Sequence, residues 1–177
     1  AVSIAAKVLR VKENEIININ VLKKGMTNRS FSFVCHEKKY IMRIPGEGTE
    51  NLINRQEEVE IYGKISKQGI CDNIIYINAD NGYKITEYIE GARVCDTFSE
   101  SDIRKCMKKL REFHECNFYV AHEFDIWRQI EFYESLWRKE ASFYKDYIQT
   151  RENIFSLKAF TEQHIDRKTL AHIDAVP

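Results

Sequence analysis

The most informative segment of this chain is Tyr40-Ile41-Met42-Arg43-Ile44-Pro45-Gly46. Its β-branched and aromatic residues favour an extended strand, and Pro45 and Gly46 end that strand. Arg43 lies inside an otherwise apolar run, and a cation held away from water needs a partner of opposite charge or a bound anion. The segment therefore predicts a strand with an inward-facing arginine that could hold phosphates. The alternative is an arginine that points into solvent from an edge strand.

An acidic partner for Arg43 is predicted on the helix that follows. From about Leu52 to Gln68 the apolar residues recur with a helical period, and Gly69 is a suitable stop residue. The first turns of this helix read Arg55-Gln56-Glu57-Glu58. We expect Glu58 to pair with Arg43, with Glu57 as the second choice. The alternative is a solvated acidic face.

Four further strands surround this strand and helix in the sequence. The period-two or β-branched segments that predict them are residues 16–22, 30–35, 74–77 and 83–88. Asn81-Gly82 indicates a hairpin between the last two. A short helix is expected at residues 2–9. With residues 39–44 as the third strand, the first half reads β-β-β-α-β-β.

The second half is expected to be mostly helical. No glycine follows Gly91, and helices are predicted from Ser99, from near Asp125, and over Ile154 to His164. The fold class is therefore α+β: a five-stranded antiparallel lobe with one main helix over residues 1–90, then a helical lobe over residues 93–177. Residues 87–92 would link the two lobes. Helical spacing favours core positions over a cation-binding cage for three aromatic residues, Trp127, Tyr133 and Trp137.

Three other segments fit the same element order, which is that of a kinase-like fold. Residues between the first two strands, Gly25, Met26, Thr27 and Asn28, could cover phosphates with backbone N–H groups, although an ordinary turn would look the same. Backbone groups of Glu87 and Ile89 could face an adenine edge, or could simply end a strand. His172-Ile173-Asp174 follows an apolar lead-in, as at the start of a kinase catalytic loop. Asp174 would be the catalytic base and His172 would brace the loop; a surface turn is the alternative.

Composition excludes several classes of protein. Lys plus Arg and Asp plus Glu both number 27, so the formal net charge is zero and no nucleic-acid partner is indicated. No apolar run approaches the roughly 20 residues of a membrane span, and the first residues do not read as a signal peptide. The five cysteines are odd in number and lack Cys-x-x-Cys spacing, which favours reduced thiols in the cytoplasm and no zinc site.

These segments together resemble the choline/ethanolamine kinase family, in particular its bacterial choline kinases, within the aminoglycoside-phosphotransferase-like group. The segments that carry the resemblance are residues 24–28, 40–46, 53–58, 83–91, 110–114 and 170–174. The resemblance implies ATP- and Mg²⁺-dependent phosphorylation of choline or ethanolamine. It assigns Asp174 as the base, Arg43 with Glu58 and residues 25–28 as phosphate-binding, and residues 87–89 as adenine-binding.

The resemblance also implies what this sequence lacks. In the family an Asn of the catalytic loop and a metal-binding Asp follow, so no metal ligand is predicted within the chain and the 177-residue polypeptide alone is expected to be inactive. Self-association is expected through the faces of Leu136, Trp137 and Phe160. Two alternatives remain open: a kinase of another small molecule such as an aminoglycoside, and a non-catalytic nucleotide-binding or assembly module.

Overall fold

The computed structural model describes residues 1–22, 28–49, 52–137 and 142–173, which form two compact units. Unit 1 comprises residues 1–115 and unit 2 comprises residues 116–173. The lobe boundary expected near residue 90 falls within unit 1 and stays a prediction.

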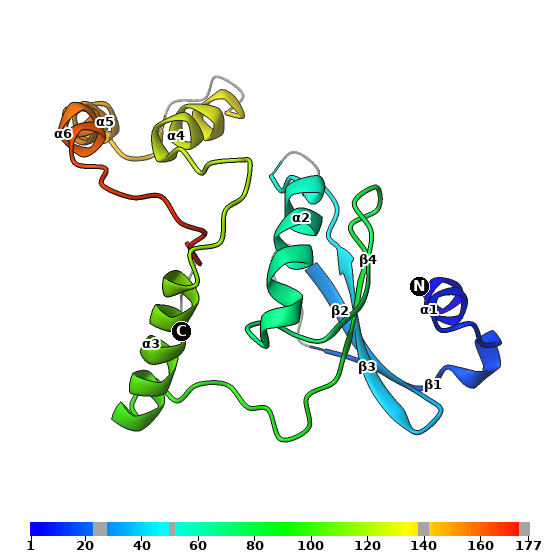
Figure 1. Cartoon of the computed structure of the whole chain (residues 1–177). Coiled ribbons are helices and arrows are strands. Elements are labelled where there is room, and N and C mark those ends of the chain that lie inside the picture. The colour runs from blue at the N-terminus through cyan, green and yellow to red at the C-terminus, as the bar shows by residue number, and fades with distance from the viewer. Residues whose placement is uncertain (23–27, 50–51, 138–141, 174–177) are drawn as a thin grey trace. The chain divides into compact units, whose positions relative to one another are not determined.

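Unit 1 is built on a five-stranded antiparallel sheet with the strand order β1-β2-β3-β5-β4, as Figure 1 shows in part. The strands are β1 (Ile17–Val21), β2 (Asn28–Cys35), β3 (Lys38–Pro45), β4 (Ile74–Ile77) and β5 (Lys84–Glu87). Helix α2 (Arg55–Ile65) follows β3 and continues into the 3-10 turn η2 (Ser66–Gln68); a second 3-10 turn, η1 (Glu13–Glu15), precedes β1. The predicted order β-β-β-α-β-β is confirmed.

One face of the sheet carries the apolar core. Phe33, Met42 and Ile85 come from three neighbouring strands and are fully buried. Alternate residues of a strand point to the same face, so each of these strands contributes one set of side chains to this core. Helix α1 (Val2–Leu9) adds Ala5 and Ala6 to this cluster. Figure 1 shows α1 and α2 on opposite sides of the sheet. The apolar core therefore lies under α1 and leaves the other face to α2.

The face toward α2 is polar across its centre. The strand register aligns Ser30 of β2 with Arg43 of β3, and Arg43 with Lys84 of β5. Directly paired residues of antiparallel strands share a face, so two cations lie side by side beneath α2. This face holds the predicted site.

Helix α2 starts at a capped end. The side chain of Asn54 accepts hydrogen bonds from the backbone N–H groups of Gln56 and Glu57 at 3.1 and 3.3 Å. Such a cap satisfies donors that the first helical turn leaves unpaired. It fixes the first turn of α2, and with it Arg55 and Glu58.

The connection between β4 and β5 contains the Asn81-Gly82 pair that indicated a hairpin. It spans residues 78–83, and Asn78 organises it by accepting hydrogen bonds from two backbone N–H groups. Gly82 has a φ of +65°, and a Cβ there would lie 2.6 Å from Pro45 Cγ and 2.9 Å from Arg55 Nε. This turn therefore approaches β3 and α2 closely only because residue 82 is glycine.

Helices complete both units. Unit 1 includes α3 (Glu100–Glu115), and unit 2 contains α4 (Ile126–Ser135), α5 (Tyr147–Phe155) and α6 (Lys158–Gln163). The single helix expected over residues 154–164 is wrong: α5 ends there and α6 begins. The Ser156 hydroxyl donates to Asn153 O at 2.7 Å, and the Ser135 hydroxyl donates to Phe132 O at 2.6 Å at the end of α4. Serine hydroxyls that bond the backbone in this way compete with helix continuation, and the hydrophobic pattern does not reveal them.

The expectation that Trp127, Tyr133 and Trp137 are core residues is also only partly met. Trp137 and Tyr133 are each 46% exposed. Trp127 packs edge-on against Phe155 of α5, whereas Trp137 packs against Tyr147. The two tryptophans thus hold α4 to α5 at separate points and do not form one cage.

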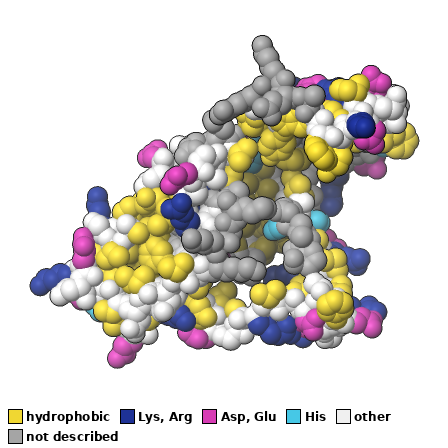
Figure 2. Space-filling view, turned by 180° about the vertical axis from the view of Figure 1, so that it is seen from behind, with side chains coloured by type: hydrophobic (Ala, Val, Ile, Leu, Met, Phe, Trp, Pro, Cys, Tyr) yellow, Lys and Arg dark blue, Asp and Glu magenta, His cyan; other side chains and the backbone are white. Residues whose placement is uncertain are grey.

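Large apolar side chains remain exposed in unit 2, and hydrophobic side chains are prominent on the face drawn in Figure 2. Leu136 is 44% and Phe160 is 61% exposed. Self-association through them stays a prediction. None of the five cysteines forms a disulfide. Within the described ranges, no helix has the length and apolar character that crossing a membrane requires.

The role of Gly82 can be tested against a second glycine. We expect Gly82→Ala to lower the free energy of unfolding by about 2 kcal/mol, because alanine is strained at positive φ and its Cβ meets Pro45 and Arg55. Gly63→Ala is the control: it lies within α2 with no atom within 4 Å of a new Cβ, and should raise that free energy by about 0.5–1 kcal/mol. Urea unfolding measures both. Equal effects of the two substitutions would contradict the close-approach argument.

Candidate nucleotide-binding site

The centre of the site is the ion pair between Arg43 and Glu58. The guanidinium donates to both carboxylate oxygens, with Nη1 bonded to Oε1 and Nη2 lying 2.9 Å from Oε2. Arg43 Nη2 also donates to the carbonyl of Gly82 at 3.2 Å. The two side chains are 14% and 16% exposed. The predicted pairing is present, and its two-point geometry fixes the guanidinium plane as a lysine could not.

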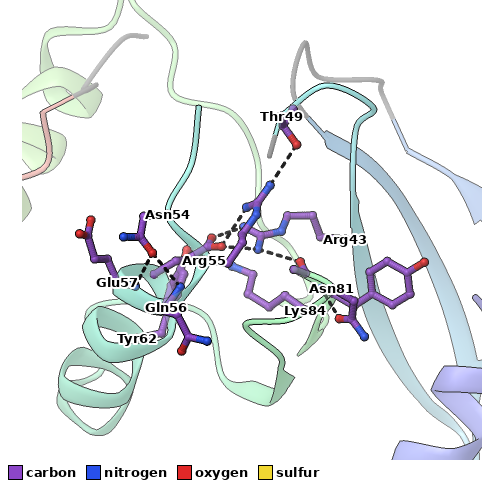
Figure 3. A network of polar contacts seen from close by, with 12 residues as sticks. Arg43, Thr49, Asn54, Arg55, Gln56, Glu57, Tyr62, Asn81 and Lys84 are labelled. Atoms are coloured by element: carbon purple, nitrogen blue, oxygen red, sulfur yellow. Dashed lines mark hydrogen bonds and ion pairs between the residues drawn. The ribbon is translucent and has the colours of Figure 1, made fainter. Parts of the chain in front are cut away.

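Arg55 is a second cation on the same carboxylate, and the sequence reasoning did not assign it to the site. Its Nη1 donates to Glu58 Oε2 at 2.9 Å, and its Nη2 donates to Thr49 Oγ1 at 3.3 Å. Thr49 in turn donates to the carbonyl of Gly46 at 2.8 Å. Figure 3 shows Arg43 and Arg55 converging from β3 and α2. The i,i+3 spacing of Arg55 and Glu58 was the available signal.

Glu58 is held as a carboxylate by these two arginines. Its burial acts to raise the pKa of the carboxyl, but hydrogen bonds from Arg43 and Arg55 and their charges outweigh that effect, so the pKa lies below its ordinary value. Two guanidinium groups share one carboxylate, so this group of three residues keeps a net positive charge. A surplus cation of this kind, sheltered from water, suits an anionic ligand.

Lys84 is a further buried cation that the sequence reasoning missed. It is 8% exposed, and its Nζ donates to the hydroxyl of Tyr62 at 3.0 Å and lies 4.2 Å from the centre of that ring. Asp72 lies 3.6 Å from the same Nζ. Figure 3 places Lys84 between the turn at Asn81 and helix α2. Lys84 lies in a strand segment that also carries Thr86 and Glu87, so the sequence marked it less clearly than Arg43.

The Arg43 side chain retains one unused donor. Its Nε is buried, and no atom of the described residues accepts a hydrogen bond from it. A buried donor without an acceptor costs free energy that a bound oxygen would recover. The described residues therefore fit a phosphate group at this guanidinium.

The segment after β5 is where adenine contacts are predicted. The backbone N–H of Glu87 donates to Asn73 O at 2.9 Å, and the Asn73 side chain donates to the Glu87 carboxylate at 2.5 Å. Tyr88 N donates to Lys39 O at 2.9 Å, which extends the β3–β5 pairing to this point. Ile89 is 56% exposed. Glu87 is thus fixed between strands while Ile89 stands at the surface; adenine recognition by either remains a prediction.

The chain beyond this point is tied to α3 through Asp102. Arg93 donates to both oxygens of the Asp102 carboxylate, with Nη2 at 2.9 Å from Oδ1, and the backbone N–H of Asp96 donates to Oδ2 at 3.1 Å. The Arg93 guanidinium, helped by that N–H, lowers the pKa of Asp102 to about 2. Residues 93–96 are therefore held against the first turn of α3.

The remaining predicted residues are only partly described. Gly25, Met26, Thr27 and Asp174 lie outside the described residues. Asn28 begins β2 opposite Pro45. His172 is exposed in a segment without regular secondary structure. Their predicted roles in phosphate binding and catalysis stay predictions.

The residues that the structure describes do not form a cluster of metal-ligating side chains. Among them, no three or more His, Cys, Asp or Glu side chains come together in a way that could hold a metal ion. Glu58, the carboxylate nearest the site's cations, is already bonded to two arginines.

Comparison with known proteins decides the family. The sequence profile of the choline/ethanolamine kinase family matches residues 19–176, which is most of the chain. The chain belongs to the choline/ethanolamine kinase family. The five-stranded antiparallel sheet with its helices matches the protein-kinase-like fold of this family, as predicted.

Individual relatives support the same assignment. The crystal structure of choline kinase LicA from Streptococcus pneumoniae aligns with a TM-score of 0.83 and 32% identity, over 99% of this chain and 60% of that one. A structure of LicA in complex with AMP aligns with a TM-score of 0.79 and 32% identity, over 99% of this chain and 61% of that one. Protein LicA from Haemophilus influenzae strain Rd is 23% identical over 86% of this chain and 58% of its own length. The chain thus spans about three fifths of these relatives.

The shared carboxylate gives this member of the choline/ethanolamine kinase family a defined acid sensitivity. At neutral pH we expect Glu58→Gln to lower the free energy of unfolding by about 2–3 kcal/mol, because two partly buried arginines lose their counter-charge. The pKa of Glu58 is lower in the folded state than in the unfolded one, so its stabilisation is present above about pH 4.5 and is lost as the pH falls through the lowered value. Urea unfolding at several pH values measures the difference between the variant and the wild type, which should shrink in acid.

Glu60→Gln is the matched control on the same helix. Glu60 lies 3.0 Å from Lys64 in an i,i+4 pair near the surface, so its loss should cost about 0.5 kcal/mol or less. A Glu58→Gln effect as small as this, or one that does not change with pH, would contradict the role given to Glu58.

Proposed function

We propose that this chain forms the nucleotide-binding part of a kinase that transfers the γ-phosphoryl group of ATP to the hydroxyl of choline or ethanolamine. Family membership supports a phosphotransferase that acts on a small molecule of the choline type. The observation that carries the nucleotide assignment is the guanidinium of Arg43, fixed by Glu58, with one buried N–H that has no acceptor among the described residues.

The phosphates of ATP are the anion that this arrangement suits. Arg43 would donate from Nε to a phosphate oxygen while Glu58 and the Gly82 carbonyl hold its other nitrogens. Residues 25–28 would add backbone N–H groups, and residues 87–89 would bind the adenine. A LicA structure with 32% identity to this chain was solved in complex with AMP, which supports an adenine nucleotide as the ligand.

The proposed chemistry is an in-line displacement at phosphorus. The substrate hydroxyl oxygen attacks the γ-phosphorus, ADP leaves, and Asp174 accepts the hydroxyl proton, with His172 bracing the loop. Mg²⁺, when bound with ATP, would neutralise charge that builds up on the phosphate oxygens. Arg43 contributes by orientation and by its positive charge, and takes no part in the proton transfer.

The proposal also covers the kind of organism that makes the protein and the cellular compartment in which it works. The LicA relatives come from bacteria, and we propose a bacterial protein that works in the cytoplasm, where ATP and reduced cysteines are both available. Choline is the proposed substrate ahead of ethanolamine, because a LicA relative at 32% identity is described as a choline kinase.

Removing Arg43 tests the nucleotide assignment. We expect Arg43→Ala to weaken ATP binding at least tenfold by calorimetry, since a charge-assisted hydrogen bond contributes about 1.5–3 kcal/mol. Arg43→Lys should recover only part of the affinity, because lysine keeps the charge but cannot form the two-point contact with Glu58. Arg104→Ala, on the exposed face of α3, should bind ATP as the wild type does.

A loss of folding would imitate this result, so the double variant Arg43→Ala with Glu58→Ala is also needed. It removes both charges and avoids an unpaired buried carboxylate. Restored folding by circular dichroism with ATP affinity still lost would support the proposal. Wild-type ATP affinity in either folded variant would refute it.

We further propose that the 177-residue polypeptide binds ATP without phosphorylating choline. The described residues hold no three-ligand metal cluster, and metal-assisted neutralisation of phosphoryl charge contributes much of the rate in such reactions. An assay with ATP, Mg²⁺ and choline, ethanolamine or an aminoglycoside should give no substrate-dependent ADP. Choline-dependent ADP production by this polypeptide would overturn the proposal of inactivity and would support the assigned substrate.

A further inference from the structure

Two cysteines lie on either side of the contact between residues 93–96 and helix α3. Cys95 falls between Arg93 and Asp96, and both of these residues hydrogen-bond the carboxylate of Asp102. Cys106 follows Asp102 by four residues on α3, and residues four apart share one face of a helix. The backbone near Cys95 is therefore held over the helix face that carries Cys106.

The two side chains meet. The Cys95 thiol interacts with the side chain of Cys106. Cys106 is exposed, and Cys95 is half-buried. The interaction with Cys106, together with partial burial, raises the pKa of the Cys95 thiol.

We propose that Cys95 and Cys106 are a modification site, which forms a reversible intramolecular disulfide by exchange with a low-molecular-weight disulfide such as glutathione disulfide. Of the other cysteines, Cys35 is buried in the sheet core, and Cys71 hydrogen-bonds the carbonyl of Asp72. The proposal does not depend on the function proposed above.

The exchange takes place in two steps. The exposed Cys106 thiolate attacks one sulfur of glutathione disulfide, the S–S bond breaks, and one glutathione thiolate leaves. Cys95 then loses its proton to solvent, its sulfur attacks the Cys106 sulfur, and the second glutathione thiolate leaves. The two cysteines are oxidised by two electrons, and one glutathione disulfide is reduced to two thiols.

The disulfide would add a covalent bond between residues 93–96 and helix α3. Without it, this contact depends on the ionised carboxylate of Asp102. Arg93 and Asp102 hold the segment to α3 by hydrogen bonds, and these weaken in acid once the carboxylate is protonated. A disulfide would keep residues 93–96 on the helix regardless of pH. The segment that follows the predicted adenine contacts would then lose freedom of movement on oxidation.

Peptide mapping by mass spectrometry tests the proposal. The full chain is incubated with glutathione disulfide, quenched by acid, alkylated and digested under non-reducing conditions. A peptide that links Cys95 to Cys106, lighter by two hydrogens than its two reduced parts and lost on adding dithiothreitol, is the expected result. Cys116→Ser, which removes another exposed cysteine of the chain, should leave the yield of this peptide unchanged.

The single variants distinguish the order of attack. Cys95→Ser should accumulate glutathione on Cys106, because the resolving thiol is gone, whereas Cys106→Ser should react several-fold more slowly. Glutathione that stays on Cys106 in the wild type, or a cross-link from either cysteine to Cys116, would overturn the proposal. Circular dichroism of each variant confirms that the chain remains folded.

Discussion

A cation within an apolar strand has to be neutralised where it stands, and this requirement organises unit 1. Arg43 lies on β3 with Lys84 beside it on β5, so the sheet presents two positive charges to the layer above. Helix α2 can cover that face only by placing Glu58 over Arg43 and Tyr62 over Lys84. The helix is thus located by polar contacts on one side of the sheet, while apolar packing against α1 holds the other side. Because the apolar side chains pack on the α1 face of the sheet and the charged ones lie on the α2 face, the α2 face keeps a surplus positive charge that a ligand can use.

Glu58 connects more than one element because two arginines share it. Arg43 links it to β3 and to the turn at Gly82, and Arg55 links it to Thr49 in the segment after β3. A displacement of α2 would therefore disturb β3, the β4–β5 turn and the Gly46–Thr49 segment together. In kinase-like folds the position of this helix controls whether the phosphate-binding cation is correctly placed. In this chain the control would extend to a larger set of residues than one ion pair.

The sequence predicted unit 1 well, because its strands alternate and its charges are conspicuous. Arg43 inside an apolar segment required a partner, and the first helix after it offered Glu58. Lys84 was not predicted to need a partner, because the strand segment around it already carries Thr86 and Glu87. Arg55 was missed because one carboxylate was matched to one cation, although a buried carboxylate can accept from two. In unit 2 the hydrophobic period did not show where Ser135 and Ser156 end their helices, since those endings depend on hydroxyl–carbonyl bonds. The roles of residues 25–27 and Asp174 rest on the resemblance alone.

The pairing of α4 with α5 gives the molecule an internal optical probe. The chain has only two tryptophans, Trp127 and Trp137, and both lie in unit 2 against rings of α5. Unit 1, with Arg43 and Glu58, has none. Intrinsic emission excited at the red edge of indole absorption therefore reports on unit 2 alone. A change in that emission when ATP is added would show a response in unit 2, observable without any label.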